Sequence, residues 1–310
     1  MRRRRAGHRE KCLTRIAVII NGSAGAGHGQ DQAASLRLKF AAHALEADVT
    51  LAADGEAIIA ATRRAVVQRL PVVVAGGGDG TINAVASVLA DHPHIAFGVL
   101  PLGTLNHFAK DAGIPLDLDE AIATIARGAR RRVDLGEVNG RIFLNNSSLG
   151  LYPDIVRERE KQQHRLGRGK WLAACWATLR ALKRYPFLNV SLRLDDGADH
   201  VRSTPFVFVG NNEYSMQGFN LGARARLDGG RLSLCMAQRP GRLALLRLGW
   251  CALRGRLAQE GDFDMLQARS MEIETRERRV RVATDGEVTV MHSPLRYRIR
   301  PGALNVIVPM

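Results

Sequence analysis

The chain has few cysteines, and their spacing argues against two common kinds of site. Its 310 residues include four cysteines, and no two of them form a Cys-x-x-Cys pair. Zinc sites and disulfide frameworks depend on close or regular cysteine spacings, so neither is expected, and a reducing compartment fits best. The four residues are Cys12, Cys175, Cys235 and Cys251.

Long uncharged apolar runs are also missing. A helix that spans a bilayer needs about 20 apolar residues, and no segment of this sequence approaches that length without a charge. Arg2 to Arg5 are followed by polar residues rather than by the apolar core of a secretory signal. We therefore expect a cytoplasmic protein with a disordered basic arm at residues 1–13.

Acidic residues are in short supply. The chain has 45 Lys and Arg against 30 Asp and Glu, which gives a net charge of +15. Such an excess predicts attraction to a polyanion, namely nucleotide phosphates, nucleic acid or an anionic membrane surface. A solvated basic surface that only aids solubility is the alternative.

The hydrophobic pattern changes at about residue 133. Residues 14–133 alternate short β-branched runs, such as Ile16–Ile20, with helical stretches, which predicts an α/β domain with a Rossmann-like parallel sheet and nucleotide-binding function. Residues 134–310 contain mainly short strand-like segments and predict a C-terminal antiparallel β-sandwich-like domain for the substrate. The final segments, 295–300 and 303–308, either stay in this domain or return to the first one.

A glycine-rich turn follows the predicted strand at 72–75. Gly-Gly-Gly-Asp-Gly-Thr at 76–81 leads into a helix with an apolar face. Glycines let main-chain amides approach phosphate oxygens, and a helix N-terminus favours negative charge. Asp79 would repel a phosphate unless it faces Mg²⁺. The turn therefore indicates a polyphosphate and metal site, with a tight strand–helix turn and an Asp cap as the simpler alternative.

A second turn of this kind follows the next predicted strand. Gly103 allows close approach of the main chain, and Thr104 offers a hydroxyl. Two such turns on successive parallel strands would border one triphosphate. The spacing matches neither Gly-x-Gly-x-x-Gly nor the P-loop, which argues against a dinucleotide dehydrogenase and a P-loop ATPase.

Together these motifs resemble the diacylglycerol kinase catalytic family. Gly-Gly-Asp-Gly-Thr at 77–81, Pro-Leu-Gly-Thr-x-Asn at 101–106 and Asp-Gly-Glu at 285–287 stand in the family's order. The resemblance extends from about 14 to 309 and is that of a bacterial-type member with a second domain. Further matching stretches are 21–25, 133–136, 209–212, 225–230 and 301–304.

The resemblance implies ATP and Mg²⁺ as cofactors. It implies a magnesium-and-water network at Asp79 and Asp134, and a second, structural magnesium site at Ala225, Asp228 and Gly230, for which an Asp-Gly turn is an equal alternative. The residues implied to contact ATP are Asn21, Gly22, Ser23, Ala24, Gly25, Thr50, Gly77, Gly78, Asp79, Gly80, Thr81, Ile82, Asn83 and Thr104.

The family's Asp-Gly-Glu tripeptide supplies a carboxylate that takes the proton from a lipid hydroxyl. A positioned carboxylate helps because an alcohol is a poor nucleophile at neutral pH. The sequence does not decide between Asp285 and Glu287, and a hairpin turn with solvated acids is the alternative. One position departs from the family pattern, because His107 stands where Asp is usual after Gly-Thr-x-Asn. Imidazole is a poor ligand for Mg²⁺.

The expected function is transfer of the ATP γ-phosphate to a lipid hydroxyl, and a diacylglycerol-like lipid is the favoured acceptor. Segments 168–184 and 242–256 combine tryptophan with basic residues in a helical pattern, which is typical of helices on anionic membranes and also of helices packed on their own domain. We expect a lipid acceptor at an anionic membrane surface, a peripheral membrane association and no nucleic-acid partner, with a homodimer left open. The rivals are an NAD kinase-like small-molecule kinase and a non-catalytic protein that senses nucleotide or binds nucleic acid.

Overall fold

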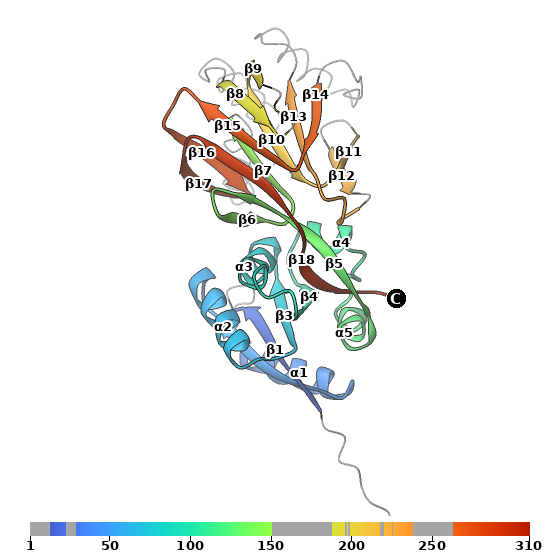
Figure 1. Cartoon of the computed structure of the whole chain (residues 1–310). Helices are drawn as coiled ribbons and strands as arrows, with labels where there is room; N and C mark the ends of the chain where they lie inside the picture. Colours follow the sequence, from blue (N-terminus) through green and yellow to red (C-terminus); the bar gives the residue numbers. More distant parts are fainter. Residues whose placement is uncertain are drawn as a thin grey trace, which may run out of the picture. The chain divides into compact units, whose positions relative to one another are not determined.

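The computed structural model describes residues 13–22, 29–150, 188–195, 197, 199–217, 220–224, 226–237 and 263–310 (Figure 1). Its contacts divide the chain into two units. The first holds the described residues up to Ala109, together with Gly113–Arg131 and Asn305–Met310. The second holds Lys110–Ala112 and the described residues of Arg132–Leu304. The segments predicted to be basic amphipathic helices, 168–184 and 242–256, lie outside the described residues.

A parallel sheet forms the centre of the first unit, as the sequence predicted. Its strands lie in the order β2-β1-β3-β4, and each neighbouring pair is parallel. β3 and β4 are buried along their whole length, which is typical of parallel strands covered by helices on both faces. The bounds are β1 Thr14–Asn21, β2 Leu45–Ala52, β3 Val72–Gly77 and β4 Ala96–Pro101.

Helices follow these strands and pack on the sheet. α1 (Gly29–Ala41) packs on β2 and α5 (Leu118–Arg127), whereas α2 (Gly55–Val67) packs on α3 (Asp79–Leu89). Aspartates at the N-caps begin two of them: Asp54 accepts from the Ala57 N–H, and Asp117 accepts from two N–H groups of α5. A short helix, α4 (His107–Asp111), follows β4.

The second unit is built from antiparallel strands, which confirms the predicted change of class. A six-stranded sheet has the order β14-β13-β10-β7-β16-β17. A second group of strands runs β18-β15-β8-β9, with β5 beside β18 and β6 beside β5. β11 and β12 form a separate pair. The bounds are β5 Ala129–Val138, β6 Arg141–Phe143, β7 Asn146–Gly150, β8 Leu188–Leu194, β9 Asp199–Thr204, β10 Phe206–Asn211, β11 Tyr214–Gln217, β12 Asn220–Arg224, β13 Leu232–Ala237, β14 Phe263–Ala268, β15 Ser270–Thr275, β16 Arg279–Thr284, β17 Glu287–His292 and β18 Leu295–Val308.

The last strand, β18, pairs at both of its ends. Leu295 to Arg298 pair antiparallel with β15 in the second unit, and Asn305 and Val306 pair in parallel with β4 in the first. The sequence indicated strand-like segments at 295–300 and 303–308, and the structure joins both in this one strand. Gly302 takes a positive φ of 55° within the strand, which glycine can do without ending the extended backbone.

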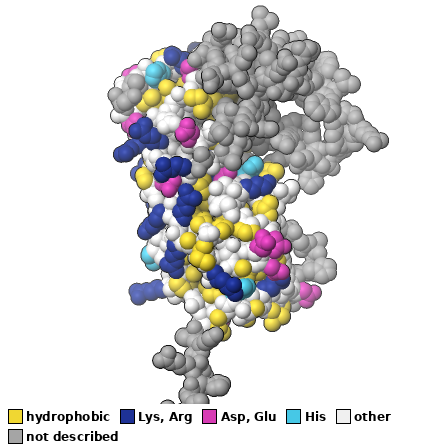
Figure 2. Space-filling view, turned by 90° about the vertical axis from the view of Figure 1, so that its right-hand side faces the viewer, with side chains coloured by type: hydrophobic (Ala, Val, Ile, Leu, Met, Phe, Trp, Pro, Cys, Tyr) yellow, Lys and Arg dark blue, Asp and Glu magenta, His cyan; other side chains and the backbone are white. Residues whose placement is uncertain are grey.

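Basic side chains are spread over one face of the described part of the molecule (Figure 2). Figure 2 shows Lys and Arg side chains at many points of the face it presents, with hydrophobic and acidic side chains between them. Within the described ranges, no helix is both long enough and apolar enough to cross a membrane.

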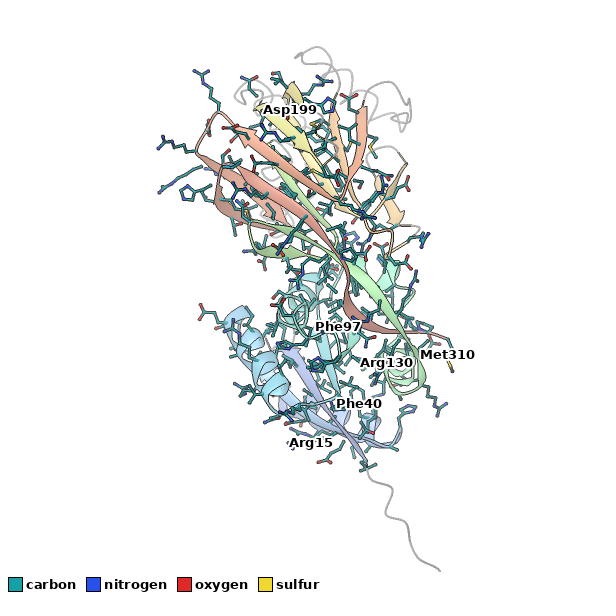
Figure 3. All side chains as sticks on the ribbon, in the orientation of Figure 1. Arg15, Phe40, Phe97, Arg130, Asp199 and Met310 are labelled. Carbon is teal, nitrogen blue, oxygen red and sulfur yellow. The ribbon has the colours of Figure 1, made fainter. Side chains whose placement is uncertain are left out.

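Each unit has its own apolar core. Phe40 and Phe97, labelled in Figure 3, are fully buried in the first unit. In the second unit the two groups of strands bury their inner faces in one cluster, which includes Leu149, Val209 and Val282 from the six-stranded sheet. Val190, Ile273 and Tyr297 come from the other group. Burial of these alternating side chains explains why the segments form a sandwich.

Candidate active site

Two glycine turns of the first unit touch at the carboxyl edge of the parallel sheet. Gly77, at the end of β3, and Pro101, at the end of β4, are partners in register. A Cβ atom at Gly103 would lie 2.4 Å from the Gly78 Cα, a separation that no side chain could tolerate. The structure therefore brings residues 76–81 and 103–106 together, and only glycine at position 103 permits it.

Asn106 holds the second turn in shape. Its Oδ1 accepts from the Gly103 N–H at 3.1 Å, and its Nδ2 donates to the carbonyls of Gly103 at 2.8 Å and Pro101 at 3.2 Å. The residue is buried and has a φ of 51°, a conformation that asparagine tolerates better than most residues. The motif contained Asn106, but sequence reasoning gave it no role. An asparagine shortly after a glycine turn was the available signal.

Asp79 lies in the first turn of α3 and reaches the next helix. Its Oδ1 accepts from the Phe108 N–H of α4 at 3.4 Å. It is therefore an Asp cap, although of α4 rather than of its own helix. Its other oxygen has no protein partner among the described residues, and the side chain is partly exposed. Mg²⁺ is commonly held by one or two carboxylates together with phosphates and water, so this carboxylate fits a nucleotide-bound Mg²⁺. His107, which precedes Phe108 at the start of α4, is exposed.

The other predicted nucleotide residues fall into three groups. Gly22, Gly80 and Thr104 are exposed, whereas Asn21, Thr50 and Gly78 are partly buried. Gly77, Thr81, Ile82 and Asn83 are buried. The Asn83 Oδ1 is buried without a hydrogen-bond partner in the described part of the chain, which is rare for a buried polar atom. Ser23, Ala24 and Gly25 lie outside the described residues.

The Asp-Gly-Glu tripeptide of the second unit forms a tight hairpin. Thr284 and Glu287 pair as the last residues of β16 and β17, and Asp285 and Gly286 connect them with φ values of 48° and 87°. Two central residues with positive φ are typical of a type I′ turn, for which Asp-Gly is a preferred sequence. The alternative interpretation of this tripeptide, a hairpin turn with solvated acids, is therefore correct for the backbone conformation.

The two acids of this tripeptide have different surroundings. Asp285 is not solvated as that alternative supposed, because its Oδ2 accepts from the Leu144 N–H at 2.6 Å. Its Oδ1 accepts from the N–H groups of Asn145 at 2.8 Å and Asn146 at 3.1 Å. Burial raises the pKa of Asp285 to about 6, although the three N–H donors and Arg224 lower it in part. Glu287 is exposed and pairs with the Arg141 guanidinium.

Two of the predicted metal residues contact each other in the second unit. The buried Asp134 carboxylate accepts from the Gly230 N–H at 2.7 Å and from the Gly302 N–H at 2.8 Å. Asp228 is exposed and accepts from the Arg226 Nε at 3.1 Å. Ala225 lies outside the described residues. No group of three or more His, Cys, Asp or Glu side chains gathers in the described part. Magnesium binding at these positions stays a prediction.

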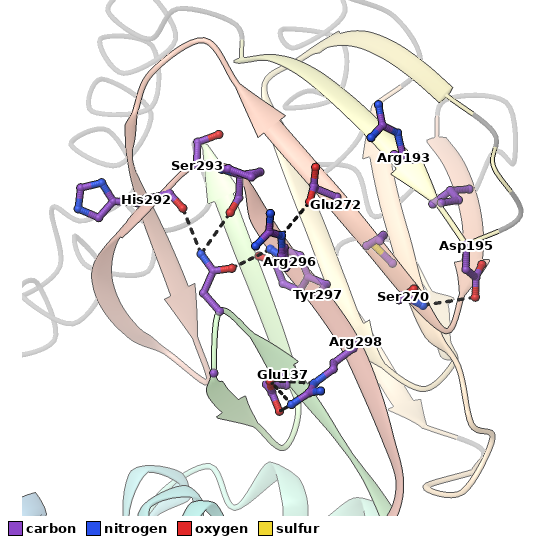
Figure 4. Close-up of a pocket in the computed structure, with 15 residues that line it drawn as sticks. Glu137, Arg193, Asp195, Ser270, Glu272, His292, Ser293, Arg296, Tyr297 and Arg298 are labelled. Atoms are coloured by element: carbon purple, nitrogen blue, oxygen red, sulfur yellow. Dashed lines mark hydrogen bonds and ion pairs between the residues drawn. The ribbon is translucent and has the colours of Figure 1, made fainter.

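A cavity of about 760 Å³ in the second unit contains none of the predicted residues (Figure 4). Its arginines face acids: Arg296 donates to Glu272, and Arg298 forms two hydrogen bonds with Glu137. Opposite charges on neighbouring strands stabilise such a sheet surface. The charges of Arg296 and Arg298 are therefore balanced by acids of the same sheet, and neither arginine by itself indicates an anion site.

The fold and the site define a two-domain α/β protein with two touching glycine turns at the carboxyl edge of its parallel sheet. Comparison with protein families agrees. Residues 15–138 match the model of the diacylglycerol kinase catalytic domain, and residues 154–308 match the YegS C-terminal NAD kinase beta sandwich-like domain. The chain belongs to the diacylglycerol kinase catalytic-domain family, in its YegS-type form with the second domain.

Individual relatives support this assignment. The chain is 31% identical over 307 residues to "Probable lipid kinase YegS-like" of Pseudomonas aeruginosa strain PAO1, with 95% of this chain and 94% of the relative covered. It is 28% identical over 230 residues to a protein named diacylglycerol kinase from Staphylococcus carnosus, with 73% of each covered. A crystal structure titled as a diacylglycerol kinase from Bacillus anthracis strain Sterne has the same fold, with a TM-score of 0.71, 23% identity and 95% and 97% of the two chains covered. The chain is a kinase of this type.

The pKa of Asp285 predicts a pH-dependent stability. Because burial raises this pKa from 3.8 to about 6, the folded state holds the proton more tightly than the unfolded state. The contribution of Asp285 to the free energy of unfolding is therefore fully present below about pH 4 and is lost as the pH rises through about 6. We compare the free energy of unfolding of the wild type with that of Asp285→Asn at each pH. The wild-type value minus the variant value should fall by roughly 1–3 kcal/mol as the pH rises from about 4 to above 6. Urea unfolding across this range measures it, and a constant difference would contradict the expectation.

Proposed function

We propose that this protein is an ATP-dependent lipid kinase that transfers the γ-phosphate to a lipid hydroxyl, with a diacylglycerol-like acceptor. The observation that carries the proposal is the contact of the turns at Gly78 and Gly103 at the carboxyl ends of two parallel strands. In open α/β sheets, ligands bind at these ends. Phosphate oxygens are the ligands that such turns suit, because the amide groups are not screened by side chains.

Asp79 is the proposed magnesium residue. Its Oδ2, for which the described residues offer no partner, would face the metal, while Oδ1 accepts from the Phe108 N–H of α4. Mg²⁺, when bound with ATP, neutralises charge on the β- and γ-phosphates. We also propose that Asp134 acts by holding the glycines at 230 and 302 rather than through direct metal contact, because both of its oxygens accept main-chain N–H groups.

Glu287 is the proposed general base. The Asp285 carboxylate accepts three main-chain N–H groups, whereas Glu287 is exposed and, among the described residues, pairs only with Arg141. In the transfer, the lipid hydroxyl oxygen forms a bond to the γ-phosphorus as the bond to the bridging oxygen of ADP breaks. The hydroxyl proton goes to the Glu287 carboxylate. Asp285 would keep the turn in the shape that presents Glu287.

One face of the β16–β17 hairpin suits an anionic membrane. Arg279, Arg281, Val288, Val290 and His292 are exposed and lie on the same side, because Arg279 pairs with His292 and Arg281 with Val290. No acid of the hairpin lies on this hairpin face, since Glu287 alternates to the other side. Cations beside apolar side chains are typical of surfaces that dock on anionic lipids. The acceptor would be reached from such a membrane.

Substitution Asp79→Asn tests the proposed metal role. Asparagine can still accept from the Phe108 N–H but lacks the charge that Mg²⁺ requires, so we expect kcat to fall on the order of 100-fold or more with an unchanged melting temperature. γ-labelled ATP is supplied with diacylglycerol, a mixed lipid extract or NAD. Asp48→Asn, at an exposed acid paired with Arg15, is the control. Transfer to NAD alone would replace the proposal with the small-molecule kinase.

Substitution Glu287→Gln tests the base. Glutamine can still accept from Arg141 but cannot take a proton at neutral pH, so we expect kcat to fall about 100-fold or more while KM for ATP stays within about two-fold. The control is Glu272→Gln, which also replaces an acid paired with an arginine. Wild-type kcat in Glu287→Gln would rule this residue out as the base.

The hairpin face predicts salt-dependent membrane binding. Each cation near an anionic surface adds about 1 kcal/mol, so Arg279→Gln/Arg281→Gln should bind vesicles of phosphatidylcholine and phosphatidylglycerol about 10- to 30-fold more weakly than wild type. Sedimentation of vesicles measures the binding, which should also weaken with salt. Arg193→Gln, at an exposed arginine of β8, is the control. Equal binding by the double variant and the control would exclude this face.

A further inference from the structure

A buried arginine, Arg224, lies next to the main chain that holds the Asp285 turn. Its side chain has 0% exposure, and it ends β12 in the second unit. Sequence reasoning gave it no role. A charge in the interior is costly unless its donors are paired and an opposite charge is near, so the partners of its guanidinium are informative.

The guanidinium uses all three of its nitrogens. Nε pairs with the Asp111 Oδ2 at 2.8 Å, which supplies the opposite charge. Nη1 donates to the Leu144 carbonyl at 2.6 Å, and Nη2 donates to the Asn145 Oδ1 at 2.9 Å. Two of the three nitrogens therefore bind the segment Leu144–Asn145, whose N–H groups bind Asp285.

One peptide group connects the arginine to the acid. The carbonyl of Leu144 and the N–H of Asn145 belong to the same peptide unit. The carbonyl accepts from Arg224, and also from the Asn211 Nδ2 at 2.8 Å, while the N–H donates to the Asp285 Oδ1 at 2.8 Å. A cation on the oxygen polarises the peptide and strengthens its N–H as a donor, by about 10–30% per bond.

The following peptide group has the same arrangement. The carbonyl of Asn145 accepts from the Tyr214 hydroxyl at 2.8 Å, and the N–H of Asn146 donates to Asp285 at 3.1 Å. The Arg224 guanidinium carbon lies 5.5 Å from the centre of the Tyr214 ring, a cation–π distance. Arg224 thus supports both peptide groups, one directly and one through Tyr214.

We propose that Arg224 is the positioning residue of the Asp-Gly-Glu turn, acting on Asp285 through the peptide groups of Leu144–Asn145 and Asn145–Asn146. This inference rests on the proposed function for its link to catalysis, because Glu287 is the neighbour that the turn presents. It adds a residue that touches neither ATP nor the acceptor in the proposed mechanism. Loss of Arg224 would loosen the turn and lower kcat without changing the first unit's nucleotide turns.

The charges around Asp285 give this role a pH signature. Arg224 of β12 favours the ionised carboxylate, and it also acts on Tyr214 of β11. Asp111 of α4 pairs with Arg224, and Arg141 of β6 pairs with Glu287 on β17. Without the Arg224 charge, Asp285 should protonate at a higher pH. The acid limb of the kcat profile should therefore move to higher pH.

The experiment compares three variants in the full-length protein. Arg224→Lys keeps the charge but not the planar fork. Arg224→Met removes both, and Arg224→Met/Asp111→Asn also removes the carboxylate that would be left unpaired, in case the single variant does not fold. Arg193→Met, which breaks the exposed Arg193–Asp199 ion pair, is the matched control. The readouts are kcat, KM for ATP and the pH profile of kcat.

We expect Arg224→Met and the double variant to lose on the order of 100-fold in kcat, as a small misplacement of a catalytic group can cause. KM for ATP should stay within about two-fold, the acid limb should move to higher pH, and Arg224→Lys should restore its position. Wild-type kcat and an unmoved acid limb in folded Arg224→Met/Asp111→Asn would overturn the proposal.

Hydrogen exchange separates this inference from the proposed function. The amides of Asn145 and Asn146 should exchange at least about 10-fold faster in the Arg224→Met/Asp111→Asn variant than in wild type, because their carboxylate acceptor is less firmly held. If wild type transfers no phosphate to lipid, the proposed function fails, yet this exchange still tests the positioning role. Unchanged exchange at both amides would overturn the positioning role whether or not the enzyme is active.

Discussion

The approach of two glycines is the constraint on which the first unit's site depends. Gly78 and Gly103 lie so close that neither turn could keep its path with a side chain at position 103. The parallel register of β3 and β4 brings the turns to the same edge, and Asn106 fixes the shape of the second one. The candidate site is therefore bordered mainly by main chain, and the register of the sheet fixes its position.

Carboxylates bind main-chain N–H groups throughout this protein. Asp285 accepts three of them, Asp134 accepts two from glycines, and Asp79 accepts one from α4. Such bonds to a charged acceptor are stronger than neutral ones and orient the acid as well as the loop. The number of bonds also distinguishes the acids: the more N–H groups a carboxylate accepts, the fewer lone pairs it has left for a metal.

Much of the fold and part of the site could be predicted from sequence. The buried runs at 16–20 and 72–75 gave the parallel sheet because such runs depend on local pattern alone, and Asp-Gly is a local signal for the hairpin turn. The contacts of Asp285 could not be predicted, because their donors lie about 140 positions away in the chain. The ion pair between Arg224 and Asp111 could not be predicted for the same reason, because the two residues lie 113 positions apart.

The pairing of β18 with β4 sets a condition on the order of folding. Val306 lies beside Phe97, more than 200 positions earlier in the sequence, and the contacts of Asn305–Met310 assign those residues to the first unit. During synthesis one edge of β4 therefore stays unpaired until the residues of the second unit have been made. An exposed strand edge is a template for pairing with other chains, and long-range pairing of this kind is slow. Until residues 305 and 306 cover it, this edge of β4 is therefore open to pairing with other chains.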